Sequence, residues 1–253
     1  MIEVTLLSIL QGIAEFLPIS SSGHLVLGKH LLGLHEMGLR LDVFLHMGTL
    51  LAVFAFYFSV IRRIVVGREW AYMLKIVLSA VPAGVTGLLL MTHFKESLAA
   101  LETPDAVGVS LIFTGFILTA TRFLPRGHQD VSFGRAFWMG LAQAIAILPG
   151  VSRSGMTIAA ARISRVEAEK CAEFSFLMSA PPIAGAALLE LLKGLGEAPA
   201  AAEVSWPLTI YGALLAAVVG YLSLKALVKS LKSRWFWLFG PYCFLMGLLA
   251  LLF

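Results

Sequence analysis

Two polar segments interrupt this hydrophobic sequence, and together they carry the residue types needed for chemistry on a phosphate group. The first, QGIAEFLPISSSGH, spans Gln11–His24 and contains Glu15 and three serines. The second, QAIAILPGVSRSGM, spans Gln143–Met156 and places Arg153 between two serines. A carboxylate can bind a divalent cation or act as a base, and a guanidinium offers two parallel donors to phosphate. Serine, histidine, carboxylate and arginine together suit phosphoryl transfer, in which positioning and charge neutralisation do most of the work.

The two segments are copies of one motif, 132 positions apart. Aligned without gaps they share six of fourteen residues, at Gln11/Gln143, Ile13/Ile145, Ala14/Ala146, Ser20/Ser152, Ser22/Ser154 and Gly23/Gly155. The acidic residue is not shared, because Ile147 stands where the first copy has Glu15. Internal repeats that carry broken hydrophobic segments are the usual way in which a membrane protein builds a polar site at mid-bilayer.

In each copy a serine-rich turn precedes a predicted helix. Residues 20–22 are serines before Gly23, and Ser152 and Ser154 flank Arg153 before Gly155. Serine is a preferred N-cap, and the free amides of a helix N-terminus favour an anion, most naturally a phosphate. We therefore expect the two turns to meet around one anion site, to which Arg153 adds positive charge.

The composition places the chain in a membrane. Hydrophobic residues make up 59% and charged residues 13%, and the mean hydropathy is +0.89. A soluble domain has roughly 45–50% apolar and about 25% charged residues. The chain carries a net charge of +4. The meaning of this charge depends on where the charged residues lie, and it does not imply nucleic acid as a partner. Cys171 and Cys243 stand singly in apolar stretches, so we expect packing residues rather than a disulfide or metal pair.

Six apolar runs are long enough to cross a hydrocarbon core of about 30 Å. They lie near 41–61, 71–93, 106–122, 171–193, 208–225 and 236–253. The loops around Arg63, Arg126 and Lys229 are the basic ones. By the positive-inside rule these three loops are cytoplasmic, which predicts that both termini lie outside.

The remaining apolar segments, 1–35 and 136–165, are then predicted to be re-entrant helical hairpins that enter from opposite faces. Repeat one (1–123) and repeat two (133–253) each contain one hairpin and three spans. An odd number of crossings inverts the second copy relative to the first. The predicted fold is a single all-α integral membrane domain over 1–253, with an inverted-topology repeat, six transmembrane helices and two re-entrant hairpins. The hairpin tips should line an internal polar pocket, because irregular backbone at that depth needs protein or water around it.

The motifs resemble those of a known family. The segment from Gln11 to His24, taken with Pro149-Gly-Val-Ser-Arg-Ser-Gly-Met-Thr157, is similar to the two signatures of bacterial undecaprenyl-diphosphate phosphatases of the bacitracin-resistance type. The resemblance covers essentially the whole chain. It implies a multi-pass enzyme of the bacterial cytoplasmic membrane, with its active site facing the outer side. That enzyme hydrolyses undecaprenyl diphosphate to undecaprenyl phosphate and phosphate, recycling the lipid carrier for cell-wall synthesis, and it requires Mg²⁺ or Ca²⁺.

The resemblance also implies roles for individual residues at the motif positions. It places Glu15 (also the metal ligand) and Gln11 in the acidic motif, Ser20, Ser21 and His24 in the catalytic cluster, and Ser152, Arg153, Ser154 and Thr157 in the phosphate-binding motif. Glu15 and Arg153 are then catalytic residues as well, and Gln11 also binds phosphate. Many members have glutamate where this chain has Gln11, which weakens any metal site made of two carboxylates. The implied partners are the polyprenyl diphosphate substrate and membrane lipids.

Several alternatives stay open at this point. A transporter or flippase for a phosphorylated lipid or an anion would also use an inverted repeat, although the unequal chemistry of the two tips favours hydrolysis. Ser21, His24 or an activated water could each attack phosphorus, and dimerisation and the selection of lipid chain length are undetermined. Structural roles are the other alternative: Ser22 and Ser154 as N-caps, His24 bonded to a hairpin carbonyl, His46 as a satisfied core histidine, Thr157 bonded to its own helix, and Gly84, Gly87, Gly115, Gly212 and Gly220 as close-packing positions.

Overall fold

The computed structural model describes residues 1–33, 39–194, 204–233 and 235–252. The described part is helical throughout, with one isolated bridge between Gln129 and Val166. Its helices, in chain order, are α1 (Ile2–Ala14), α2 (Ser21–Leu32), α3 (Leu39–Phe56), α4 (Phe58–Val66), α5 (Trp70–His93), α6 (Lys95–Ala99), α7 (Pro104–Ala120), η1 (Thr121–Phe123), α8 (Phe133–Ile145), α9 (Arg153–Ile163), α10 (Ala168–Gly194), α11 (Trp206–Lys232), η2 (Trp235–Leu238) and α12 (Phe239–Ala250). The all-helical class is confirmed for these residues.

Within the described residues, three helices are long and apolar enough to cross a membrane: Trp70–Leu90, Pro104–Phe123 and Trp206–Lys232. A fourth span is formed if the bent pair Arg40–Phe56 and Phe58–Val66 counts as one. The three agree with the predicted runs 71–93, 106–122 and 208–225, and the bent pair covers 41–61, so three or four of the six predicted spans are found among the described residues. The protein is a helical membrane protein. The ends of the predicted hairpin 1–35 and of the predicted span 236–253 lie outside the described residues.

The prediction of one continuous helix over 41–61 is wrong. Helix α3 ends at Phe56, and α4 leaves it at an angle of 71°. Near the end of α4, Arg63 Nη2 lies 3.9 Å from Glu173 Oε1 in the first turns of α10. Arg63 Nε also pairs with Glu69 at 3.3 Å. Arg63 therefore lies near one carboxylate just before α5 and one on α10.

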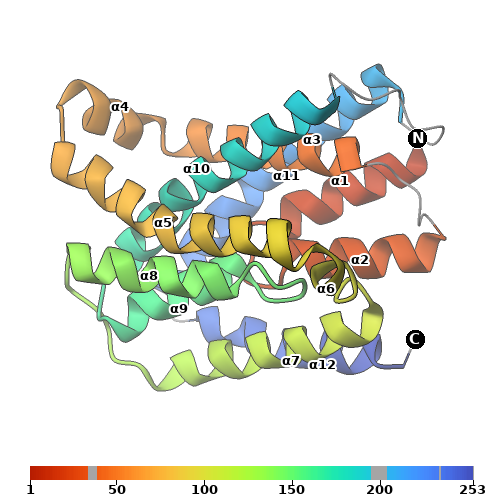
Figure 1. Ribbon diagram of the computed structural model, residues 1–253. Helices are drawn as coiled ribbons and strands as arrows, with labels where there is room; N and C mark the ends of the chain where they lie inside the picture. The colour runs from red at the N-terminus through yellow and green to blue at the C-terminus, as the bar shows by residue number, and fades with distance from the viewer. Residues whose placement is uncertain (34–38, 195–203, 234, 253) are drawn as a thin grey trace.

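Two helical hairpins enter the molecule from opposite ends, as Figure 1 shows: α1 and α2 from one side, α8 and α9 from the other. Helices α3 and α11 pack along one side of them, and α7 packs beside α12 on the other. Both termini lie at the same end of the molecule (Figure 1). This arrangement brings the two turns that carry the repeated motif into the middle of the fold.

Close helix packing depends on several of the predicted glycines, but not on all of them. A Cβ at Gly115 would lie 3.0 Å from Gly240 O, and one at Gly220 would lie 2.6 Å from Phe16 Cε2. A Cβ at Gly84 would meet nothing within 4 Å, so the packing role expected there is wrong. Cys171 and Cys243 are buried and free, as expected.

Candidate active site

Each hairpin turn is held by a serine cap. The Ser20 hydroxyl oxygen accepts from the Gly23 amide at 3.3 Å, and the Ser152 hydroxyl oxygen accepts from the Gly155 amide at 3.1 Å. The alternative that Ser22 and Ser154 are the N-caps is therefore wrong, because the first serine of each turn is the cap. The hydroxyls of Ser22 and Ser154 instead lie 3.3 Å from the hydroxyl of the capping serine two residues earlier. The caps start α2 and α9 at the turns, so the free amides of both helices begin there.

The two tips touch, as the repeat predicts. Ser20 Oγ donates to Val151 O at 3.4 Å, and Ser154 Oγ donates to Leu17 O at 3.3 Å. The backbones approach so closely that a Cβ added at Gly23 would lie 2.9 Å from the Cα of Gly150. The two halves of the chain therefore build one site at their contact.

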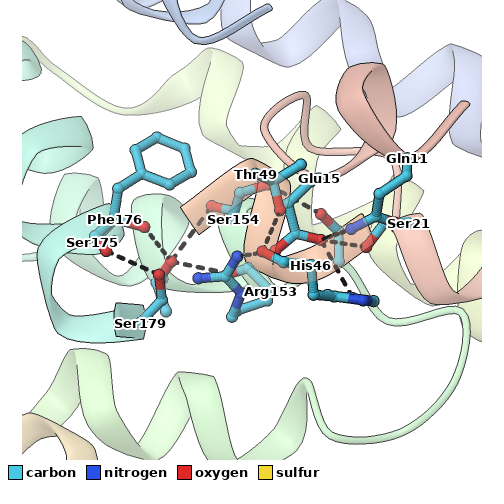
Figure 2. Close-up of polar contacts among 12 residues, drawn as sticks. Gln11, Glu15, Ser21, His46, Thr49, Arg153, Ser154, Ser175, Phe176 and Ser179 are labelled. Carbon is cyan, nitrogen blue, oxygen red and sulfur yellow. Dashed lines mark hydrogen bonds and ion pairs between the residues drawn. The ribbon is translucent and has the colours of Figure 1, made fainter. Parts of the chain in front are cut away.

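Glu15 is the centre of this site, and only 5% of its side chain is exposed. Its Oε2 accepts from Ser21 Oγ at 2.6 Å and from Gln11 Nε2 at 3.1 Å, which confirms that Gln11 and Glu15 share a helix face. Its Oε1 accepts from Arg153 Nη2. Figure 2 shows these side chains converging from both hairpins. The first copy of the motif thus supplies the negative charge, and the second copy supplies the positive charge.

Arg153 retains a donor for a ligand. Its Nη1 is buried and has no hydrogen-bond partner within the described part of the chain, whereas Nη2 is taken by Glu15. A buried donor left unpaired costs about 1–3 kcal/mol, more for a charged group. A phosphate oxygen at Nη1 would remove this cost, so the observed geometry suits binding of an oxyanion.

A cavity of about 200 Å³ surrounds these groups. Its walls are Ala14, Glu15, Ser20, Ser21, Ser22, His46, Ala146, Ile147, Val151, Ser152, Arg153, Ser154 and Ile183. The cavity is polar along the two turns and apolar where α8 ends and where α10 passes. Six of the predicted site residues line it: Glu15, Ser20, Ser21, Ser152, Arg153 and Ser154. Ser22 lines it as well. Gln11 reaches it through Glu15.

His24 lies close to the cavity but is turned away from the reactive serines. Its Nδ1 donates to Ser20 O at 2.9 Å, which leaves Nε2 to accept from Tyr242 Oη at 2.8 Å. The ring also stacks on Tyr242. The contact with a hairpin carbonyl is the structural alternative given above for this residue. Tyr242 was not foreseen, because it comes from a helix 218 residues further along the chain.

Thr157 supports the second turn from behind. It is fully buried, its Oγ1 donates to Arg153 O at 2.8 Å, and it lies 2.6 Å from Ser175 Oγ on α10. Bonding to its own helix is thus confirmed. The hydroxyl braces the carbonyl of the residue that carries the guanidinium, so Thr157 fixes where Arg153 leaves the helix.

His46 lines the site and is not the satisfied core histidine given above as one alternative. Its Nδ1 donates to Asp42 O at 2.8 Å, and its Nε2 lies 3.7 Å from Glu15 Oε2. It lines the cavity, and a third of its side chain is exposed. The only sequence signal was a titratable residue inside a hydrophobic helix, which does not tell which way the side chain points.

A divalent cation would find few protein ligands here. Within the described residues, no group of three or more His, Cys, Asp and Glu side chains could hold a metal ion. One observation fits a cation nevertheless: Gln11 Oε1 is fully buried, beside Glu15, and has no partner in the described part of the chain. An amide oxygen and one carboxylate are a sufficient protein share for Mg²⁺, which usually completes its shell with water and substrate phosphates.

The fold and site define a class: a helical membrane protein with a buried carboxylate, a serine hydroxyl and a guanidinium arranged around a cavity for an oxyanion. A family model described as bacitracin resistance protein BacA matches residues 4–249, and the chain belongs to this family. It is 37% identical to an undecaprenyl-diphosphatase of Desulforapulum autotrophicum, over 97% of this chain and 95% of the relative. The same name is carried by relatives in Desulfosudis oleivorans, 41% identical over 97% of this chain and 96% of that protein, and in Halothermothrix orenii, 36% identical over 99% and 96%.

Proposed function

We propose that this protein hydrolyses undecaprenyl diphosphate to undecaprenyl phosphate and phosphate, and so recycles the lipid carrier for cell-wall synthesis. The names of its relatives supply the substrate. The structural observation that carries the proposal is the pairing of Glu15 with both Ser21 and Arg153, while Arg153 keeps a free buried donor. This arrangement places a nucleophile, a proton acceptor and a phosphate ligand in one cavity.

In this reaction Ser21 is the nucleophile. Its hydroxyl already donates to Glu15 at 2.6 Å, so the proton passes to the carboxylate as Ser21 Oγ bonds to the terminal phosphorus. The bond from that phosphorus to the bridging oxygen breaks, and undecaprenyl phosphate leaves. Water then attacks the phosphoserine with Glu15 in place for proton transfer, which releases phosphate and restores the hydroxyl.

Charge on the transferring group is neutralised from the second hairpin. Arg153 Nη1 and the free amides at the start of α9, with Ser152 and Ser154, bind the phosphate oxygens. Thr157 keeps Arg153 in register by holding its carbonyl. Ser20 keeps the start of α2 in place, and His24 anchors the same turn to Tyr242.

Glu15 and Gln11 Oε1 would hold a divalent cation, Mg²⁺ or Ca²⁺, together with the substrate. When bound, this cation neutralises charge on the two phosphates. The test of the whole proposal is phosphate release from undecaprenyl diphosphate by the purified protein, measured with and without a chelator and again with Ser21→Ala. Activity in Ser21→Ala equal to that of the unchanged protein would exclude the serine route.

The membrane arrangement is part of the proposal: six spans and two re-entrant hairpins in the bacterial cytoplasmic membrane, with the site open to the outer side. Its support is the opposed entry of the two hairpins and the common end of both termini (Figure 1). Single cysteines at Arg63, Arg126 or Lys229, in a chain lacking Cys171 and Cys243, should resist an impermeant thiol reagent added outside. Labelling from outside would contradict this topology.

A further inference from the structure

One face of helix α7 contacts the turns of both hairpins. The helix packs against α2 and α9 (Figure 1). A Cβ at Gly23, at the start of α2, would lie 3.1 Å from Val107 Cγ1. One at Gly155, at the start of α9, would lie 3.4 Å from Leu118 Cδ2. Val107 and Leu118 are about three helical turns apart, so both lie on the same face of α7.

Gly150 lets the second turn rest directly on this face. Its φ is +87°, in the left-handed region that favours glycine. A Cβ there would lie 2.6 Å from Ser110 Cβ and 2.8 Å from Val107 O. Any side chain at this position would push the turn away from α7, so the backbone of the turn and the helix are in direct contact.

Helix α7 is itself held closely by α12. A Cβ at Gly108 would lie 2.9 Å from Gly247 O, and one at Gly247 would lie 2.7 Å from Gly108 O. The contact of Gly115 with Gly240 is of the same kind. Because the two backbones touch without side chains between them, α7 has little freedom to move under the turns.

Thr114, on the same helix, bonds the second turn at two points. Its Oγ1 donates to Gly150 O at 3.4 Å and accepts from the Ser152 amide at 3.2 Å. The side chain is fully buried. Helical threonines often bond a carbonyl of their own preceding turn, as the hydroxyls of Thr121 and Thr157 do here. The Thr114 hydroxyl instead joins α7 to two backbone groups of the other hairpin.

These two bonds fix the backbone just before Arg153. Ser152 is the N-cap of α9 and Arg153 is its first residue, so the amide that Thr114 accepts directly precedes the residue that carries the guanidinium. Thr157 holds the Arg153 carbonyl on the following side. A shift of the turn would move Arg153 and the free amides of α9 relative to Glu15.

We propose that Thr114 is a positioning residue for the phosphate-binding half of the site, an inference that rests on the proposed function. It lies outside the cavity walls described above and acts through the backbone of residues 150–152. It keeps Arg153 and the amides at the start of α9 where the transferring phosphate needs them. Misplacement of such groups by about 1 Å can cost about a hundredfold in rate.

The test compares Thr114→Val, which keeps the shape of the side chain but loses the hydroxyl, with Thr114→Ser, which keeps the hydroxyl. The probe is inorganic phosphate, and its affinity is measured from the rise that it produces in the thermal midpoint of the purified protein. Thr114→Val should weaken phosphate binding about tenfold and lower kcat about tenfold or more, because the turn loses both bonds to α7. Thr114→Ser should restore most of both.

Thr121→Val is the matched control. Thr121 is also buried and directly follows α7, but its hydroxyl donates to Leu118 O, one turn earlier in the same segment. This change should leave the phosphate affinity and kcat as they are in the unchanged protein. If Thr114→Val does not fold, Thr114→Ala takes its place with the same expectations.

Two results would overturn the inference. One is a Thr114→Val protein that is less stable but binds phosphate and turns over normally, because the hydroxyl would then support only the fold. The other is a Thr114→Ser protein as defective as Thr114→Val. Phosphate binding is measured without the lipid, so failure of the unchanged protein to hydrolyse undecaprenyl diphosphate would overturn the proposed function separately.

Discussion

Removing the charge of Glu15 should cost stability as well as activity, and the structure gives the size of the effect. Loss of one partner from a buried ion pair costs about 3–5 kcal/mol, because the other charge stays buried. Arg153 is 20% exposed, so we expect the lower end, about 3 kcal/mol, for Glu15→Gln. At about 2–4 °C per kcal/mol for a chain of this size, the thermal midpoint should fall by roughly 6–12 °C.

The assay is thermal unfolding of the purified protein in detergent, followed by circular dichroism, for Glu15→Gln, Arg153→Met and the double variant. Because the double variant leaves no unpaired charge, it should be more stable than the sum of the single changes predicts. Asp130→Asn is the matched control: Asp130 is exposed, and its pKa is lowered by a hydrogen bond from Lys170, so loss of this surface pair should barely move the midpoint. A Glu15→Gln protein as stable as the unchanged one, or strictly additive single effects, would refute a stabilising Glu15–Arg153 pair.

Four further outcomes are expected. Arg153→Lys should lose most activity although the charge is kept, because the single ammonium of lysine cannot bind Glu15 and a phosphate oxygen at once as the two guanidinium nitrogens can. Near-normal turnover would mean that Arg153 acts only as a general positive charge. Ser21→Ala should abolish turnover, whereas His24→Gln should lower the thermal midpoint more than the chemical step, and the reverse ranking in single-turnover assays would favour attack by His24. A chelator should stop phosphate release, and Gln11→Leu should raise the Mg²⁺ concentration needed for half-maximal activity; unchanged metal dependence would remove Gln11 from the site. Gln143→Leu should raise the thermal midpoint with activity retained, since both amide atoms of this buried residue lack partners in the described part of the chain, and lost activity would assign the amide a function.

The parts of the site that local chemistry determines were predictable from sequence. Serine-led turns cap helices within three residues, and Gln11 and Glu15 share a face because they are four apart. The meeting of the tips followed from the repeat. The unequal residues at its centre, Glu15 in the first copy and Ile147 in the second, indicated that the first copy supplies the carboxylate of the site.

The rest depends on contacts that no local pattern encodes. The orientation of His24 is set by Tyr242, and the role of His46 follows from how α3 packs on the first hairpin. The bend at Tyr57 was not predicted because hydropathy continues smoothly across it. Arg63, near the end of α4, lies close to Glu173, which is 110 positions away in the sequence. Hydropathy therefore located the apolar segments but not the break within one of them.

The partners at the centre of the site are 138 residues apart, and this separation has a consequence for how the protein is made. Glu15 is synthesised early, and no cation in the described part of its own hairpin pairs with it. A lone carboxylate cannot be buried cheaply, so during synthesis the first hairpin must either keep Glu15 protonated or hold it near water. Only after Arg153 has emerged can both charges be buried together. The first hairpin can therefore be fully buried only when the second hairpin inserts. A chain truncated before residue 153 should leave its amino-terminal hairpin accessible to water.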